Sequence, residues 1–526
     1  MLTELRVTNF KGFAGEHRIP LAPVTLIFGS NSSGKTALLH ALALLAENSG
    51  PAALLGPTNG GIDLSVPDID LGGYRNLMNR HDVSADRYVG LGVSADVIGF
   101  RGRAELLDMW QARASSHDFH LVQNPDGSVV VDRSHLSLHR TADISLDFET
   151  FSVEEQFQDK PDLVSEMEDE SSVRQFGLRL TPERASRAAL GLAQLFNQAK
   201  EWIDNHQSYL ENSPLPQRMP LINFWRRLDR INGTGLLSAT PDEMSSLLED
   251  GTNHQLLMRR SAGQLGHWAR WQDGVEADPS REWVKHFQEA LAGVINETNR
   301  IAYSALTRAN YLGPMRNVPS RLETLEADRP SRLTSSGRQV VSILAQSDQI
   351  LRRVNYYLSQ LLIPYSIEVV PVEPEIPSAG SYRAVVLTDL RTDTPVSPRD
   401  LGFGITQLLP VLVALASRSS NLFLVEQPEL HLHPRLHGDL ASLFVERARA
   451  SQPMQVIAET HSENLILRIQ KMIRNRDVSP DEISIVYVGS SEQVGSWIEP
   501  IRISPQGEMM DDWPGGFFTE RAQEWM

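Results

Sequence analysis

Residues Gly29 to Thr36 read Gly-Ser-Asn-Ser-Ser-Gly-Lys-Thr, which satisfies the pattern G-x-x-x-x-G-K-[ST] completely. A short, apolar, β-prone run over residues 23–28 precedes this loop, and a run rich in Ala and Leu over residues 37–47 follows it. A strand, a glycine-rich loop and a helix in this order form a cradle for nucleotide phosphates. The alternative is an ordinary Gly/Ser turn that caps a helix, and the order of the flanking elements argues against it. The loop therefore predicts an α/β fold that binds a nucleotide.

Each residue type in this loop has a physical role. Glycines let the backbone amides turn towards phosphate oxygens, Lys35 supplies a positive charge to the β- and γ-phosphates, and the Thr36 hydroxyl is placed to bind Mg²⁺. The expected nucleotide-binding residues of the loop are Gly29, Asn31, Ser32, Ser33, Gly34, Lys35 and Thr36.

Two later apolar runs supply the second half of such a site. Residues 422–425 read as a buried strand that ends in Glu426, which places a carboxylate where open α/β sheets bind ligands. Residues 456–458 form a similar run, and His461 follows shortly after it. We expect Glu426 to bind Mg²⁺ together with Thr36, and His461 to sense the γ-phosphate. A histidine after a strand is more often structural when taken alone, but its order behind the loop and the acidic strand favours the functional role.

Bulk properties narrow the class of protein. The 526 residues are enough for two or three domains, and the absence of cysteine excludes disulfides and thiolate metal sites. The chain starts directly with a strand-like pattern, and the apolar stretch over residues 408–416 is too short to cross a bilayer. We therefore expect a cytoplasmic protein with no membrane partner.

The distribution of charge is more informative than the net charge of -17. Acidic residues crowd the segment 143–170, which predicts a solvated loop. Arginine pairs at 226–227, 259–260 and 352–353 leave two alternatives open: a local basic surface that binds DNA, or helix-surface charges that pair with nearby acids.

These motifs together resemble ABC-type ATPases of the Rad50, RecF and SMC group, especially the overcoming-lysogenization-defect (OLD) type of AAA family ATPase. Residues 5–13 are similar to that group's first strand, residues 426–434 to its Walker B motif and D-loop, and residues 459–462 to its switch-histidine motif. Residues 401–410 occupy the place of its signature loop. The tail at 513–518 resembles that of bacterial standalone or defence-associated ATPases.

The resemblance implies a fold class and a domain order. The fold is α/β: an ABC-ATPase head, in which a P-loop NTPase sheet has flanking helices, interrupted by a large mixed, mainly helical insertion. Helical patterns over residues 185–206 and 281–309 support that description of the insertion. The expected parts are residues 1–75 and 335–500 for the head, 76–334 for the insertion and 501–526 for a C-terminal tail.

The resemblance also implies ATP as the nucleotide and a head-to-tail homodimer, or a higher oligomer, that closes around two ATP molecules. The signature residues that contact ATP on the opposing subunit are then Gly402, Gly404, Thr406 and Gln407. Glycines permit close backbone approach, and Thr and Gln side chains can hydrogen-bond a phosphate. The alternative is a Gly-rich helix N-terminus that contacts no ligand.

One position departs from the family pattern. The usual Walker B motif ends in Asp-Glu, with the glutamate as general base, whereas this chain has Glu426-Gln427. An amide cannot accept a proton, although it can orient a water molecule. We therefore predict slow ATP hydrolysis with Glu426, Gln427 and His461 as the catalytic residues. Glu429 is an alternative source of the missing carboxylate.

No nuclease motif is recognised, and only 65 residues follow His461. The histidines at 431, 433 and 437 suggest a metal site, but the D-loop and the helix after it explain them more simply. The resemblance therefore implies a sensor and regulator, similar to the Septu-type antiphage ATPase, that controls a separate effector nuclease such as an HNH protein. Two alternatives remain: a RecF- or SMC-like ATPase of DNA repair or chromosome maintenance, and a nuclease with its own site in the insertion.

Overall fold

The structure is a computed structural model. It describes residues 1–49, 62–66, 69–84, 87–97, 110, 112–124, 127–139, 144–152, 176–180, 182–208, 215–232, 256–261, 264–267, 282–324, 332–372 and 382–514.

The chain forms two compact units, and each is assembled from separated segments. One unit contains Met1–Thr8, Asn48–Asp63 and Val83–Ala305. The other contains Asn9–Glu47, Leu64–Asp82 and Leu306–Met526. We call the first the insertion unit and the second the head unit.

The head unit is built around a six-stranded sheet with the order β13-β18-β19-β3-β20-β21. Its strands are β3 (Val24–Gly29), β13 (Ala309–Leu312), β18 (Leu422–Glu426), β19 (Gln455–Glu459), β20 (Ile483–Ser491) and β21 (Gly495–Ile501). Neighbouring strands from β13 to β20 are parallel, and only β21 is antiparallel to its neighbour. Every residue of β3, β18 and β19 is buried, as is typical of a parallel sheet covered on both faces.

Helices cover this sheet and complete the core. They are α1 (Lys35–Glu47), α11 (Val340–Gln346), α12 (Asp348–Gln360), α13 (Phe403–Ala416), α14 (Pro434–Ala448) and α15 (Glu463–Arg474). α1 packs on β3, β13, β18 and β19, whereas α14 packs on β3 and β19. α13 is buried along nearly its whole length, which confirms the core helix expected over residues 408–416.

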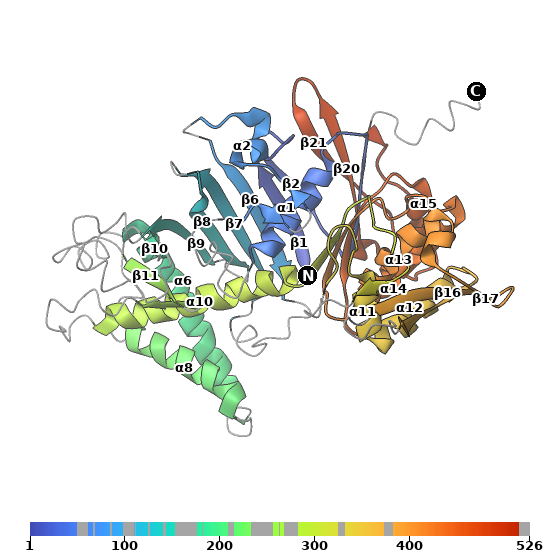
Figure 1. Cartoon of the computed structure of the whole chain (residues 1–526). Coiled ribbons are helices and arrows are strands. Elements are labelled where there is room, and N and C mark those ends of the chain that lie inside the picture. The colour runs from blue at the N-terminus through green and yellow to red at the C-terminus, as the bar shows by residue number, and fades with distance from the viewer. Residues whose placement is uncertain are drawn as a thin grey trace. The chain divides into compact units, whose positions relative to one another are not determined.

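A smaller antiparallel sheet lies beside α11 and α12 in the head unit (Figure 1). It contains β14 (Glu323–Thr324), β15 (Tyr365–Val372), β16 (Tyr382–Asp389) and β17 (Thr394–Val396). Short elements complete the unit: β2 (Glu16–Pro20), β4 (Ser65–Val66), β5 (Ile69–Asp70), α2 (Tyr74–Leu77), η2 (Asn79–His81), η7 (Pro398–Asp400) and η8 (Pro480–Glu482).

The insertion unit contains a long antiparallel sheet in the order β12-β11-β10-β9-β8-β7-β6-β1. Its strands are β1 (Leu2–Thr8), β6 (Val89–Asp96), β7 (Ala114–Gln123), β8 (Val129–His139), β9 (Ile144–Ser152), β10 (Phe176–Leu180), β11 (Leu256–Ser261) and β12 (Gln264–His267). Most neighbours along the chain are also neighbours in the sheet, which is the simplest antiparallel connection.

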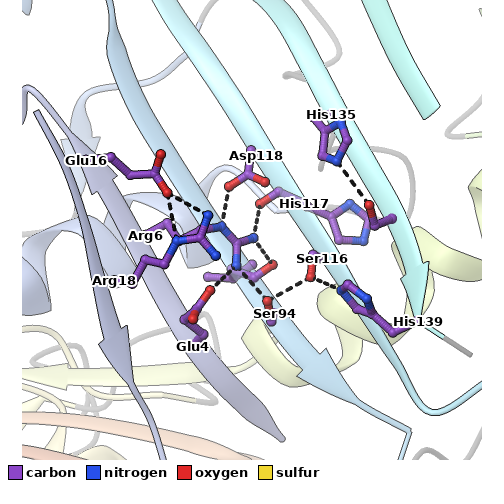
Figure 2. A network of polar contacts seen from close by, with 12 residues as sticks. Glu4, Arg6, Glu16, Arg18, Ser94, Ser116, His117, Asp118, His135 and His139 are labelled. Carbon is purple, nitrogen blue, oxygen red and sulfur yellow. Dashed lines mark hydrogen bonds and ion pairs between the residues drawn. The ribbon is translucent and has the colours of Figure 1, made fainter. Parts of the chain in front are cut away.

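A buried arginine joins three strands of this sheet (Figure 2). The guanidinium of Arg6 on β1 donates to Asp118 on β7 at 2.5 Å and to the Ser94 hydroxyl on β6 at 2.6 Å. It also contacts Glu4 at 2.5 Å. A charge buried in a sheet is tolerated when carboxylates and hydrogen-bond acceptors surround it, as they do here.

The helices of the insertion unit are α6 (Pro182–Asn205), α8 (Leu215–Asn232) and α10 (Glu282–Leu306). α6 packs against α8 and β9 (Figure 1). Gly293 of α10 lies against the Phe224 ring of α8. The helical patterns at 185–206 and 281–309 therefore correspond to α6 and α10.

The expected α/β head split by a large insertion is confirmed. The compact units are divided at other positions than the predicted domains: residues 1–8 and 48–63 belong to the insertion unit, and the second part of the head unit begins at Leu306. The domain boundaries themselves stay predictions. Within the acidic segment 143–170, residues 144–152 form the strand β9, as the alternating pattern up to residue 151 indicates, and not a loop; residues 144–149 pair with β8. Residues 153–170 lie outside the described residues. Among the described residues, no helix is long and apolar enough to cross a membrane.

The core of the head unit gives a test of the fold. Phe444 on α14 is completely buried, whereas Leu467 on α15 is 47% exposed. Replacing Phe444 by alanine should lower the free energy of unfolding of this unit by about 3–5 kcal/mol, because it leaves a cavity in a close-packed core. Denaturant unfolding measures the loss. Leu467→Ala is the control and should change stability by less than about 0.5 kcal/mol; equal effects of the two variants would contradict the core.

Candidate nucleotide-binding site

The phosphate loop needs glycine at two positions. Gly29 has φ 149° and Gly34 has φ 109°, both in the region that disfavours residues with a Cβ atom. A Cβ on Gly29 would lie 2.1 Å from the Val488 carbonyl oxygen, and one on Gly34 would lie 2.8 Å from the Ser496 hydroxyl. Both glycines of the motif are thus required by the local geometry.

Lys35 occupies the centre of the loop. Its ammonium donates to the carbonyl oxygens of Ser30 at 2.7 Å and Gly29 at 3.2 Å, and it lies 3.8 Å from a carboxylate oxygen of Glu459. Burial lowers the pKa of Lys35, and the charges of Glu459 and Glu426 partly oppose that shift. The loop opens onto the N-terminus of α1, where the helix dipole favours an anion.

Two carboxylates face the loop from neighbouring strands. Glu426 ends β18, Glu459 ends β19, and the two residues are partners in the parallel register. The Thr36 hydroxyl at the start of α1 donates to Glu459 at 2.7 Å. Both carboxylates are 5% exposed. Burial raises the pKa of Glu459, and it raises that of Glu426 to about 7.

This donor set fits Mg²⁺. Carboxylate and hydroxyl oxygens are the ligands that Mg²⁺ prefers, and Mg²⁺ usually takes only one or two carboxylates with water and substrate phosphates. In the part of the chain that the structure describes, no group of three or more His, Asp or Glu side chains could hold a metal ion alone. Thr36 and Glu426, with Glu459 beside them, would therefore hold Mg²⁺ together with a nucleotide.

The histidines at 431, 433 and 437 have other contacts. The ring of His431 packs edge-on against Phe403, with 4.8 Å between the ring centroids. His433 accepts from the backbone N–H of Arg435 as the cap of α14. His437 hydrogen-bonds Ser462 at 2.7 Å. These contacts agree with the D-loop and helix explanation rather than with a transition-metal site.

Gln427 has a strained backbone at the end of β18. Its φ of 42° is unusual for a residue other than glycine, and such strain concentrates at functional sites. Its N–H donates to the Glu459 carbonyl at 2.7 Å, and its own carbonyl accepts from Leu430 and from Arg316. Hydrogen bonds to three other residues therefore fix the backbone of Gln427, the residue at the expected base position.

Glu429 lies in the loop after β18 and contacts the segment that carries His461. One of its carboxylate oxygens accepts from the Thr460 hydroxyl at 2.7 Å and from the His461 N–H at 2.8 Å. Glu429 is buried, and these bonds hold it against the segment after β19. The His461 ring is half-buried, and burial followed by the charge of Lys35 lowers its pKa. Both effects favour the neutral form of the His461 ring.

The expected signature residues lie at the start of α13. Gly402 is its N-cap, and a Cβ on Gly404 would lie 2.5 Å from the His431 carbonyl oxygen, so this turn packs closely on the D-loop. Thr406 is buried and donates to the Phe403 carbonyl at 2.8 Å. Gln407 is also buried, and both ends of its amide bond the backbone of Arg316. Contact of these residues with ATP on a second subunit stays a prediction.

Several residues near the site were not found from the sequence. They are Lys11, His40, Tyr311, Arg316 and Glu459. Glu459 ends an apolar strand just as Glu426 does, and that pattern could have indicated it. The other four carry no spacing signal, because they reach the site from distant parts of the chain.

Arg316 links two parts of the site. Its guanidinium donates to the carbonyls of Glu426 and Gln427, and also to that of Gln407 at 3.4 Å. It is 5% exposed, and burial lowers its pKa to about 10, so it stays charged at neutral pH. One buried cation thus satisfies carbonyls at the end of β18 and at the start of α13.

Two family models match the chain. Residues 1–218 match the model described as "AAA ATPase domain", and residues 276–468 match the one described as "AAA domain, putative AbiEii toxin, Type IV TA system". Each half of the chain is therefore similar to an ATPase domain. The first match includes Lys35 and Thr36, and the second includes Glu426, Gln427 and His461, so the two matches meet at the site described above.

Solved structures are similar over the length of the chain but at low identity. The Smc head domain of Pyrococcus furiosus, with an extended coiled coil and bound to the C-terminal domain of ScpA, is 11% identical, with 100% of this chain and 98% of that chain covered and a TM-score of 0.38. The SMC head domain from Thermotoga maritima is 10% identical, with 95% and 99% covered and a TM-score of 0.33. A comparison with curated proteins gives no match. Scores this low transfer no partner or activity to this chain.

The role of Lys35 can be tested directly. Lys35→Met removes the charge but keeps a long side chain, so ATP affinity should fall by at least about tenfold, the value of one charge-assisted hydrogen bond. Calorimetric titration with ATP measures the change. Lys471→Met, on the exposed surface of α15, is the matched control and should bind ATP as the unchanged protein does. Equal affinity of the two variants would remove Lys35 from the site.

Proposed function

We propose that this protein binds ATP with Mg²⁺ and hydrolyses it slowly, so that ATP acts mainly as a switch. One observation carries the proposal: a phosphate loop with Lys35 and Thr36 lies beside Glu426 and Glu459 at the carboxyl ends of adjacent strands. In parallel sheets this edge is where ligands bind. Mg²⁺ would neutralise charge on the phosphates, and Lys35 and the amides of the loop would hold them.

Slow hydrolysis follows from Gln427. The residue after the metal-binding carboxylate is an amide, which orients water but does not take its proton. Glu429, the nearby alternative, already accepts two hydrogen bonds from the His461 segment, which favours a positioning role. With no dedicated base, ATP stays bound for longer and hydrolysis works as a timer.

We further propose that ATP closes a homodimer and that the dimer regulates a separate effector nuclease in antiviral defence. The match to a family described by a toxin and a Type IV TA system supports this context. The exposed Phe403 and Gly402 at the start of α13 offer a surface that a second subunit can approach. ATP bound across such a surface would make assembly depend on the nucleotide.

Replacing Gln427 by Glu tests the timer. A carboxylate in this position can accept the proton of the attacking water, so kcat should rise by about 10²-fold or more, the usual contribution of general base catalysis. Phosphate release under saturating ATP measures it. Gln452→Glu, on an exposed loop, adds the same charge elsewhere and should leave kcat unchanged. A rate for Gln427→Glu at or below that of the natural chain contradicts the proposed base position.

The dimer and its effector need a separate measurement. The full chain, purified with the products of neighbouring genes, should shift to a dimer or larger assembly with ATP and should return to the monomer mass when ATP is removed. Mass photometry and electron microscopy give the stoichiometry. Lys35→Met should not shift. Copurification of an HNH-type nuclease supports the defence role, whereas recovery of DNA-repair proteins in its place supports the alternative.

A further inference from the structure

A chain of hydrogen bonds leads through three side chains to the carboxylate of Glu426. Tyr311 lies on β13, the strand next to β18, and its hydroxyl contacts Oε1 of Glu426. The Nε2 atom of His40 on α1 lies 3.1 Å from the Tyr311 hydroxyl. The Nζ atom of Lys11, in the turn after β1, lies 2.9 Å from Nδ1 of His40. Three side chains from three segments of the head unit thus converge on one carboxylate.

Elementary chemistry fixes the direction of this chain. A lysine ammonium only donates, so Nδ1 of His40 accepts and its proton is on Nε2. Burial and the charge of Lys11 lower the pKa of His40 to about 4, so the ring is neutral. Nε2–H then donates to the Tyr311 oxygen, whose own proton points to Glu426. A phenol is protonated at neutral pH, so Tyr311 has a proton to donate to Glu426.

The contact with Tyr311 restricts how Glu426 can turn. Its Oε1 atom accepts from the phenol, while its backbone carbonyl accepts from Arg316. Glu426 is thus held through its backbone and through one carboxylate oxygen, and it is buried, so few orientations of its carboxylate remain open. Partners of this kind around a metal ligand fix its orientation and typically change metal affinity by 10- to 100-fold.

We propose that Tyr311 is a positioning residue for the metal-binding carboxylate Glu426, and that His40 and Lys11 hold Tyr311 in its donating orientation. The inference rests on the proposed function, because it assumes that Glu426 binds Mg²⁺ with ATP. The contacts of the Tyr311 hydroxyl are with Glu426 and His40. It acts by presenting the carboxylate in the orientation that binding requires.

A phenol beside a metal ligand can act in two ways, which change the metal affinity in opposite directions. If the phenol blocked the oxygen that the metal needs, removal of the hydroxyl would tighten metal binding. If the phenol positions the carboxylate, the same change weakens it. The direction of the change in metal affinity therefore decides between the two.

The test uses Tyr311→Phe, which removes the hydroxyl and keeps the ring that packs edge-on against His40, 5.8 Å between centroids. Mn²⁺ is titrated into the full chain with a non-hydrolysable ATP analogue, and free Mn²⁺ is read by electron paramagnetic resonance. We expect the Kd for Mn²⁺ to rise by about tenfold. Binding of the analogue in EDTA should stay within about twofold, since the phosphate loop is unchanged. An unchanged or lower Kd for Mn²⁺ overturns the inference.

Two further variants sharpen the result. Tyr365→Phe, whose hydroxyl contacts Arg391 on the surface, is the matched control and should bind Mn²⁺ normally. His40→Ala should raise the Kd for Mn²⁺ by about threefold, the value of one ordinary hydrogen bond. It removes the hydrogen bond between His40 and Tyr311, and so it tests the proposal even if Tyr311→Phe fails to fold. No rise with His40→Ala removes His40 and Lys11 from the proposal.

These measurements also separate the inference from the proposed function. If the natural chain binds neither the ATP analogue nor Mn²⁺, the proposed function fails. If it binds both and Tyr311→Phe binds Mn²⁺ equally well, only the role of Tyr311 fails.

Discussion

The parallel pairing of β3, β19 and β18 is the constraint on which the site depends. Backbone hydrogen bonds between these strands place Glu459 opposite Ile27 and Glu426 opposite Glu459. That register brings the phosphate loop and two carboxylates to one edge of the sheet, although about four hundred residues separate them in sequence. Side-chain contacts such as Thr36 with Glu459 are possible only because the backbone has already aligned the strands.

The sequence predicts those parts of the site whose function requires a local sequence pattern. The loop, the buried runs that end in Glu426 and Glu459, and the helix over 408–416 follow from periodicity and from glycine placement. All of these elements form in the expected order. The α/β head could be predicted because parallel strands buried on both faces must be continuously apolar.

What could not be predicted depends on contacts between distant segments. Nothing near Tyr311 or Arg316 in the sequence indicates that these residues reach the end of β18, because the pairing of β13 with β18 brings them there. β1 pairs with β6 of the insertion unit, and no local pattern fixes the partner of an alternating strand. Gln407, expected to face a second subunit, has its amide hydrogen-bonded within its own chain.

The contacts of Arg316 limit how the head unit can deform. If the start of α13 moved away, this guanidinium would lose Gln407, or it would leave the buried carbonyls of Glu426 and Gln427 without their donor. An unsatisfied buried carbonyl costs about 1–3 kcal/mol. The start of α13 and the end of β18 are therefore expected to move as one rigid piece. A displacement of one segment would then displace the other.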